Sequence, residues 1–133
     1  MQKVRFFVPG PLPGLNEVIN SARGTKGRGS LVAASSQKKT WTSFVSVIIR
    51  TSNQNFEMFT VPVFVDMFWV EEHKRRDPDN IVSAKKYIFD GMVQAGLIKN
   101  DGWKQIDGFR DRWTVNRIEP GVLVTVTTKQ EDL

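Results

Sequence analysis

The chain has no cysteine, a single histidine and no long apolar run, and each absence removes a class of protein. Without cysteine, disulfides and cysteine-ligated zinc sites are excluded. His73 is the only histidine, which makes a histidine-rich metal site or a Ser-His triad a poor explanation of this chain. No stretch approaches the roughly eighteen apolar residues that a transmembrane helix needs, so we expect no membrane partner. Residues 1–5 lack the apolar segment of a signal peptide, and we expect a cytoplasmic protein.

Length and composition predict one globular domain with a basic surface. A chain of 133 residues buries about two-thirds of the surface that it exposes when unfolded, and 25% charged residues is ordinary globular usage. The net charge of +5 suits a nucleic-acid binder, because each neutralised phosphate releases condensed counterions. Binding to acidic membranes, or simple solubility as a basic protein, explains the same charge. Charge alone therefore leaves the partner open.

The hydrophobic pattern predicts an α+β (mixed α/β) fold over residues 1–133, with a small mixed sheet of about four strands and two main helices. β-Branched and aromatic residues favour a central strand at 61–70. Pro120-Gly121 favours a turn between the last two strands. The expected strands are 4–8, 61–70, 107–117 and 122–128, and the expected helices are 37–50 and 78–95.

A cationic, glycine-rich loop is expected at residues 21–36, where Arg23, Lys26 and Arg28 stand among glycines. Its low apolar content predicts poor order without a partner. Two interpretations remain open for this segment. It is either a solvated surface loop or a flap that follows a phosphate backbone.

The most informative stretch places carboxylates among cations: residues 74–80 read KRRDPDN, and Lys85 and Lys86 follow. Carboxylates bind divalent cations and basic side chains bind phosphates, so the stretch suits a phosphodiester backbone handled together with a metal ion. The competing interpretation is a helix start, with Asp77 as N-cap and proline next. Acids there stabilise a helix by about 0.3–1 kcal/mol each. One cap carboxylate is enough, however, which leaves Asp79 unexplained.

The helix that begins there is expected to run from about Pro78 to Ala95, because Gly96 is a natural stop. Its apolar face, which should pack on the core, consists of Ile81, Val82, Ile88, Phe89, Met92 and Val93. Spacings of four, three and four residues place a polar row on the exposed face. This row is Asp79, Ser83, Lys86 and Asp90, of which the last two form an i,i+4 pair.

A magnesium site at Asp77 and Asp79 needs a further acid, because Mg²⁺ prefers octahedral oxygen ligation. Asp101, in a turn after the helix, is the candidate. A helix of about 18 residues is about 27 Å long, whereas the segment from Gly96 to Asp101 spans at most about 20 Å. Asp101 therefore reaches Asp77 of its own chain only if the helix is shorter or bent. Antiparallel pairing of this helix across a two-fold axis would join the acids between subunits, which predicts a homodimer with shared active sites.

These residues resemble the RusA family of Holliday-junction resolvases, which are metal-dependent endonucleases of bacteria and their phages. The matching text is RDPDN at 76–80, Lys86 with Phe89-Asp90, AGLI at 95–98 and Asn100-Asp101. It covers about residues 75–108 closely. Asn16 also looks like the asparagine that the family carries near its first strand. The motif D-x-D-N alone is a weak signal, whereas the ordered set is specific.

The resemblance implies a homodimer that uses Mg²⁺, with Mn²⁺ as an alternative. The implied metal ligands are Asp77, Asp79 and Asp101, and the implied essential lysine is Lys86. The gap between Asn80 and Phe89 is longer here than in the best-known members, so Lys85 is a competing assignment. Where the family often has paired acids, this chain has Asn100-Asp101, which leaves one carboxylate.

The function implied is Mg²⁺-dependent, structure-specific cleavage of four-way DNA junctions by paired nicks, in recombination, repair or phage DNA processing. A metal-activated water would attack the scissile phosphate, and Lys86 would stabilise the charge that develops on it. The remaining polar residues would bind DNA, mostly through its backbone and without reading sequence. The expected DNA-binding residues are Asn16, Arg23, Lys26, Arg28, Lys74, Arg75, Arg76, Asn80 and Lys85.

Two other classes of protein compete with this interpretation. A non-catalytic basic protein for branched DNA would use the same surface, with its carboxylates only as helix caps, and its binding would be indifferent to EDTA. A structural or adaptor protein of a phage has no positive feature in the sequence. Aromatic residues could add base stacking, although we expect them in the core; they are Trp69, Trp103, Phe109 and Trp113.

Overall fold

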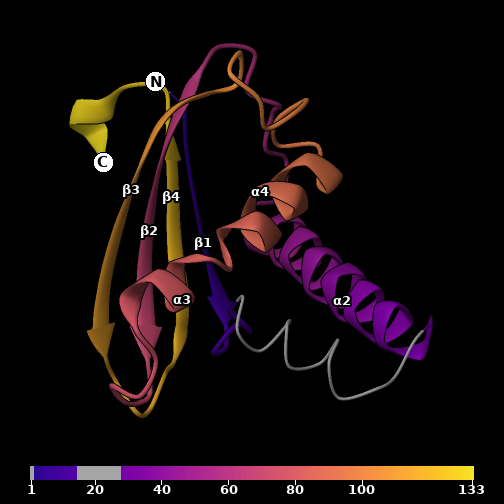
Figure 1. Ribbon diagram of the computed structural model, residues 1–133. Helices are drawn as coiled ribbons and strands as arrows, with labels where there is room; N and C mark the ends of the chain where they lie inside the picture. Colours follow the sequence, from indigo (N-terminus) through magenta and orange to yellow (C-terminus); the bar gives the residue numbers. More distant parts are fainter. Residues whose placement is uncertain (1, 15–27) are drawn as a thin grey trace.

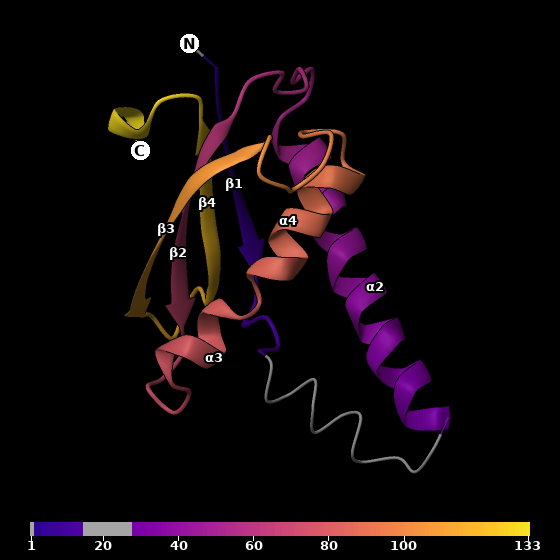
Figure 2. The same cartoon turned by 45° about the horizontal axis from the view of Figure 1, so that its top comes forward.

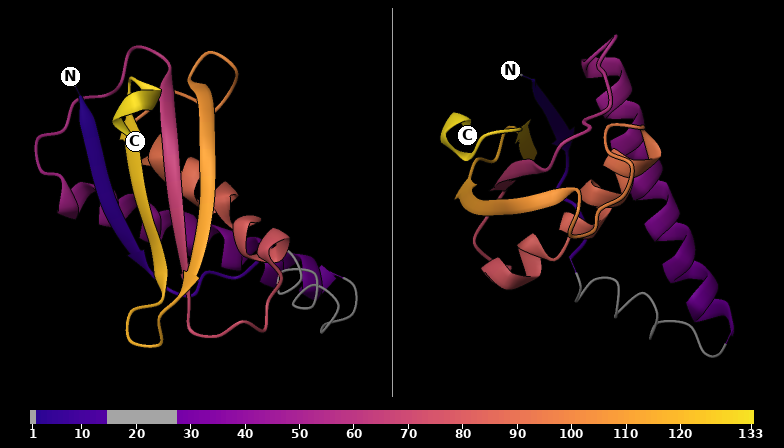
Figure 3. Two further views of the ribbon diagram at one scale, coloured as in Figure 1. Left: turned by 90° about the vertical axis from the view of Figure 1, so that its left-hand side faces the viewer. Right: turned by 90° about the horizontal axis from the view of Figure 1, so that it is seen from above.

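A mixed sheet of four strands carries its two long helices on one face (Figure 1 and Figure 3). The computed structural model describes residues 2–14 and 28–133, and within the first turns of the first helix only the backbone of residues 28–35. The strands are β1 (Lys3–Pro9), β2 (Val63–Glu71), β3 (Ile106–Val115) and β4 (Gly121–Thr127). The helices are α2 (Arg28–Ser52), α3 (Pro78–Val82), α4 (Lys85–Gln94) and a short 3-10 helix, η1 (Gln130–Asp132). The predicted α+β class is confirmed.

The strand order is β1-β4-β2-β3, so β2 lies inside the sheet as predicted for residues 61–70. β2 runs antiparallel to β4 and parallel to β3, and β1 runs antiparallel to β4. β3 and β4 follow each other in the chain but have β2 between them. Their connection passes the end of β2, where the backbone N–H of Asn116 donates to the carbonyl of Glu71 at 2.8 Å. β3 is therefore an edge strand.

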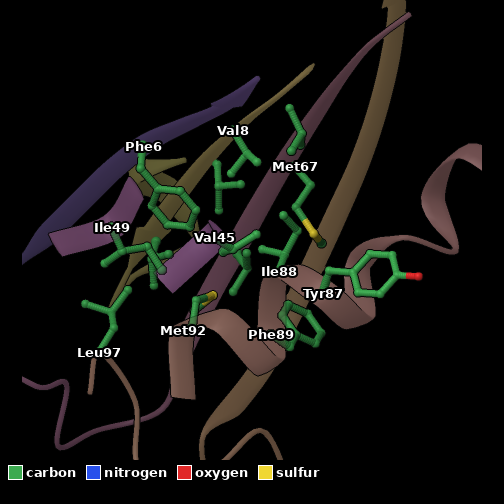
Figure 4. Close-up of a cluster of buried hydrophobic side chains, with 14 of the residues drawn as sticks. Phe6, Val8, Val45, Ile49, Met67, Tyr87, Ile88, Phe89, Met92 and Leu97 are labelled. Carbon is green, nitrogen blue, oxygen red and sulfur yellow. The ribbon is translucent and has the colours of Figure 1, made fainter. Parts of the chain in front are cut away.

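The core lies between the sheet and the helices α2 and α4. Figure 4 shows Phe6 and Val8 of β1 gathered with Val45 of α2 and with Ile88 and Met92 of α4. Alternate residues of β2 complete this layer, because successive side chains of a strand point to opposite faces. The apolar stripe predicted for residues 81–93 is confirmed, since its members are buried or pack against the core. None of the helices in the described ranges is both long and apolar enough to cross a membrane.

α2 begins well before the expected residue 37. It starts at Arg28, so the prediction of a loop is wrong for residues 28–36. Residues 31–39 are rich in leucine, alanine, glutamine and lysine, which are strong helix formers, and this propensity outweighs the glycines at the start. Arg23 and Lys26 lie outside the described residues.

The predicted continuous helix from Pro78 to Ala95 is wrong, because it breaks between Val82 and Lys85. The Ser83 hydroxyl donates to the carbonyl oxygen of Asn80 at 2.5 Å and competes with the helical ladder. The backbone tightens there into i→i−3 bonds, such as that from Ala84 N–H to the Ile81 carbonyl at 3.3 Å. α3 and α4 are therefore separate helices, and the predicted polar row is interrupted at Ser83.

The predicted end of this segment is confirmed. Gly96 has φ +79°, the left-handed conformation that favours glycine after a helix. Its N–H donates to the carbonyl of Val93 at 3.0 Å, and that of Leu97 donates to the carbonyl of Met92 at 2.9 Å. These two bonds form a Schellman motif. The turn that carries Asp101 follows directly.

An ion-pair cluster lies on the sheet face away from the helices. Asp66 of β2 is buried there and accepts hydrogen bonds from Arg110 Nε at 2.7 Å and from Arg112 Nη2 at 2.8 Å. The Arg112 guanidinium also covers the ring of Phe68, 4.5 Å from its centroid. Burial alone would raise the pKa of Asp66, but the hydrogen bonds from Arg112 and Arg110, with their charges, outweigh it and lower the pKa.

This cluster predicts an acid-sensitive contribution to stability. The pKa of Asp66 is lower in the folded state than in the unfolded state. The contribution of Asp66 to the free energy of unfolding is therefore present above the unfolded-state pKa, and it is lost as pH falls through the folded-state pKa. We expect Asp66→Asn to cost about 1–3 kcal/mol at pH 7 and to lose less stability than the wild type between pH 7 and pH 3. Urea unfolding at both pH values measures this difference. Asp107→Asn, at an exposed carboxylate, is the control, and equal pH responses of Asp66→Asn and wild type would contradict the prediction.

Candidate functional site

The first half of the candidate site lies where β2 leaves the sheet and enters α3 (Figure 1). Asp77 is the N-cap residue of α3 and Pro78 its first residue, as predicted. However, the Asp77 side chain makes no capping hydrogen bond, and it is exposed. Asp79 is also exposed, and its Oδ1 accepts only a local bond from the backbone N–H of Asn80 at 3.0 Å. The expectation that the Asp77 carboxylate satisfies the helix start is therefore wrong, and it is Asp79 that accepts a hydrogen bond from a backbone N–H of the first turn.

Arg76 is tied into the fold rather than directed to solvent. Its Nε and Nη2 donate to the two carboxylate oxygens of Glu71 at 2.7 and 2.9 Å. Its Nη1 donates to the carbonyl of Leu12 at 2.8 Å. Glu71 is buried and Arg76 is largely so. This bidentate pair joins the end of β2, the 10–14 segment and the residue before Asp77, which gives the site a fixed base.

Asn80 also points inward. It is buried, and its backbone carbonyl and side-chain oxygen would lie 2.3 and 2.5 Å from a Cβ placed on Gly14. Only glycine lets the 10–14 segment approach α3 so closely. Like Arg76, Asn80 was expected to bind DNA, and the structure gives both residues neighbours within the protein.

The cations that remain exposed near the acids are Lys74 and Arg75. They lie in the 72–77 segment between β2 and α3, beside Asp77. Of the other expected DNA-binding residues, Asn16, Arg23 and Lys26 lie outside the described residues, and only the backbone of Arg28 is described. Within the described residues, Lys74 and Arg75 are therefore the expected DNA-binding cations that are exposed beside Asp77.

The two lysines that the sequence left as alternatives have different surroundings. Lys85 Nζ forms a salt bridge with Asp111, which also accepts a hydrogen bond from Trp69 Nε1 at 2.9 Å. The same ammonium lies 4.1 Å from the centroid of the Phe109 ring. Lys85 is thus held between α4 and β3, in contacts that explain it without a ligand.

Lys86 faces the other way and bridges two acids. Its Nζ lies 3.0 Å from Asp90 Oδ1, as predicted for the i,i+4 pair, and 3.2 Å from Asp101 Oδ2. The hydrogen bonds that Lys86 donates to Asp90 and to Asp101 raise the pKa of Lys86 despite some burial. Lys86 is therefore the lysine that the structure joins to an expected metal ligand.

The three expected metal ligands do not gather in one chain. No group of three or more His, Cys, Asp or Glu side chains that could hold a metal occurs in the described residues. Figure 2 shows α3 at one end of the α3–α4 segment, whereas the 96–105 loop, which carries Asp101, follows the other end of α4. The loop folds back along α4 far enough for Asp101 to accept a hydrogen bond from Lys86, in the first turn of that helix, but within the described residues Asp101 does not form a three-acid group with Asp77 and Asp79. One chain thus holds two separate parts of the expected site.

Sequence reasoning missed the exposure of the aromatic residues. Only Trp69 is in the core as expected; Trp103 is fully exposed, and Phe109 and Trp113 are about half exposed, at 51% and 52%. The reason is that β3 is an edge strand. Its sequence, IDGFRDRWTV, carries charges on both faces, and this was the available signal.

A hollow of about 580 Å³ adjoins Asp77. It is bordered by the end of β3 and by the segment that leads into α3. Its apolar wall includes Trp113 and Val115 on one side and Pro78 and Ile81 on the other, and Lys74 lies on its rim. Sites for small ligands or for a partner's side chain have this size and mixed lining.

No protein-family model matches the chain, and no curated protein matches it. The case for a function therefore depends on the residues and their arrangement.

Two adjacent arginines provide a test of these assignments. We expect Arg76→Ala to cost about 3–5 kcal/mol of unfolding free energy, because it leaves the Glu71 carboxylate buried without its partner. Arg75→Ala should stay within about 0.5 kcal/mol, since Arg75 is exposed, but should weaken DNA binding. Urea unfolding and a DNA titration of both variants measure the two effects. A stable Arg76→Ala protein with impaired DNA binding would show that Arg76 acts as a DNA ligand instead.

Proposed function

We propose that this protein is a Mg²⁺-dependent, structure-specific DNA endonuclease that cuts four-way junctions as a homodimer with shared active sites. The observation that carries the proposal is the division of the site. Exposed Asp77 and Asp79 lie at the start of α3, whereas Asp101 lies beside α4, where it accepts a hydrogen bond from Lys86, and the described residues contain no group that joins all three acids. Two copies related by a two-fold axis would complete two such sites. The ordered likeness of residues 75–108 to the RusA family supports the same arrangement.

The donor set suits the proposed ion. Aspartate carboxylates are the hard oxygen ligands that Mg²⁺ prefers, and a site with few protein ligands leaves room for waters and substrate phosphate. Asp77 and Asp79 are exposed, and Asp77 is not used as a helix cap. Together with Asp101 from a second copy, they would hold the ion. When bound, the ion would polarise the scissile phosphate and lower the pKa of a water.

The protein's own cations have distinct roles in this proposal. A lysine ammonium is charged at neutral pH, so that of Lys86 can stabilise negative charge on the phosphate oxygens. Lys74 and Arg75 are exposed beside Asp77 and would hold the backbone without reading sequence. Two symmetric sites suit a junction in which two strands of like polarity must be nicked.

The alternative is a non-catalytic basic protein that binds branched DNA. The absence of a three-acid group in the described part of a single chain favours it. It predicts junction binding that is the same with Mg²⁺ and with EDTA, and no nicking in either condition.

Asp79→Asn separates the two functions. It preserves size and removes one carboxylate, so we expect junction binding within about threefold of the wild type, a change of about 0.7 kcal/mol or less. Nicking in Mg²⁺ should fall by at least about 100-fold. A labelled four-way junction, with Mg²⁺ or EDTA and beside linear duplex, measures both quantities. Retained nicking would remove Asp79 from the mechanism, and absence of nicking by the wild type would favour the binding protein.

A complementation experiment tests whether the sites are shared. Neither Asp79→Asn nor Asp101→Asn should nick alone. After subunit exchange, a mixed dimer should regain one complete site, since the Asp79→Asn chain still supplies Asp101 and the Asp101→Asn chain still supplies Asp79. We expect single nicks without resolution.

The matched control mixes Asp77→Asn with Asp79→Asn, which lie in the same half of the site and cannot complement each other. Tagged subunits would verify that exchange has occurred. If mixed dimers form and the first pair stays inactive, the sites are not shared between subunits.

A further inference from the structure

The edge strand β3 and its flanking turns carry a concentration of exposed apolar side chains. Of the large apolar residues that are exposed in the described ranges, those in this region are Trp103, Phe109, Trp113, Val115 and Ile118. Trp103, at 101% relative exposure, is not covered by any other described residue of its own chain. An exposed indole forgoes the favourable burial that a tryptophan side chain can provide, and no described residue of this chain covers it.

Among the described strands, none pairs with the outer side of β3. Within the described residues its only partner in the sheet is β2. It is ten residues long, and a long edge strand with apolar side chains is a template for pairing with another chain. Phe109, Trp113 and Val115 share one face of the strand, because they are separated by even numbers of residues.

The two ends of β3 are complementary. The turn that contains Trp103 precedes its first residue, and the hollow beside Asp77 borders its last residues. If β3 pairs antiparallel with its copy, the start of one strand lies beside the end of the other. Trp103 of one copy would then lie beside the hollow of the other. Asp101 is two residues before Trp103, a span of at most about 7 Å, so it would come close to Asp77.

We propose that two copies of this chain pair edge to edge along β3 and that Trp103 of each copy fills the hollow beside Asp77 of the other. This interface rests on the proposed function, and it supplies the contact that brings Asp101 to the other copy's acids. The apolar wall formed by Trp113, Val115 and Ile81 accepts the indole. Lys74 on the rim lies where the Asp101 carboxylate arrives. A second copy explains both the exposed tryptophan and the divided carboxylates, whereas an unstacked nucleobase in the hollow would explain neither.

Trp103→Ala tests the anchor. Buried tryptophans are among the strongest contributors to interfaces, so the dimer dissociation constant should rise by about 30-fold or more. Thermal unfolding of the isolated chain should not change, because no described residue of its own chain covers the indole. Trp103→Phe should largely restore dimerisation. The control is Val47→Ala, an exposed apolar residue on α2, and sedimentation velocity over a range of concentrations provides the readout.

A disulfide cross-link tests the pairing direction. Because the chain has no cysteine, only the introduced thiols can react. Lys104→Cys combined with Val115→Cys should give a covalent dimer on oxidation, because the two positions meet only between antiparallel copies. Within one chain Lys104 lies in the turn before β3 and Val115 is the last residue of β3, so the two are about 30 Å apart. Each single-cysteine variant should cross-link at most weakly.

The outcomes separate the interface from the function. A monomeric Trp103→Ala protein that nicks only at high concentration supports the interface. A Trp103→Ala protein that remains dimeric and active overturns the anchor and leaves the endonuclease proposal intact. A wild-type dimer that cross-links but never nicks supports the interface and removes the enzyme. A dimeric Trp103→Ala protein whose binding to single-stranded oligonucleotides is weakened places a nucleobase at Trp103 and overturns the proposal.

Discussion

The geometry at the start of α3 depends on the ion pair between Glu71 and Arg76. A buried pair of this kind is a weak source of net stability, because desolvation of the two charges offsets much of their attraction. Its contribution here is to fix the orientation of the Arg76 side chain. Two parallel hydrogen bonds fix the guanidinium plane, a third bond reaches the carbonyl of Leu12, and Asp77 is the next residue in the chain. The exposed carboxylates therefore project from a rigid base.

The ends of the helical segment could be predicted from the sequence, whereas the role of Arg76 could not. That Asp77 starts a helix followed from Asp-Pro, and that Gly96 ends one followed from its freedom to adopt positive φ. Both are local signals. The role of Arg76 depends on Glu71 and on Leu12, which is 64 residues away, and no local pattern contains that information. An arginine beside a candidate site looks the same in sequence whether it binds DNA or supports the backbone.

The break between α3 and α4 and the fates of the two lysines follow the same logic. Hydrophobic spacing correctly identified the core-facing stripe, which spans the break, but it did not detect that Ser83 bonds back to Asn80. On a helix, neighbouring residues point about 100° apart. That rotation directs Lys85 to Asp111 on β3 and Lys86 outward to Asp90 and Asp101. The sequence left Lys85 and Lys86 as alternatives for the essential lysine. The packing favours Lys86, because Lys85 is already paired with Asp111 and Lys86 lies beside Asp101.

The edge position of β3 connects the proposed pairing of two copies with the divided candidate site. Sequence patterns identified the strand but not its place in the sheet, because strand order is set by contacts between distant segments. An edge strand with charges on both faces could remain soluble as a monomer, and its apolar residues and unpaired backbone could still select a copy of itself. Under the proposed arrangement a lone chain has an incomplete site, so catalysis requires assembly. Such coupling would suit an enzyme of four-way junctions, where a single unpaired nick leaves the junction unresolved, since the act of pairing would create both sites at once.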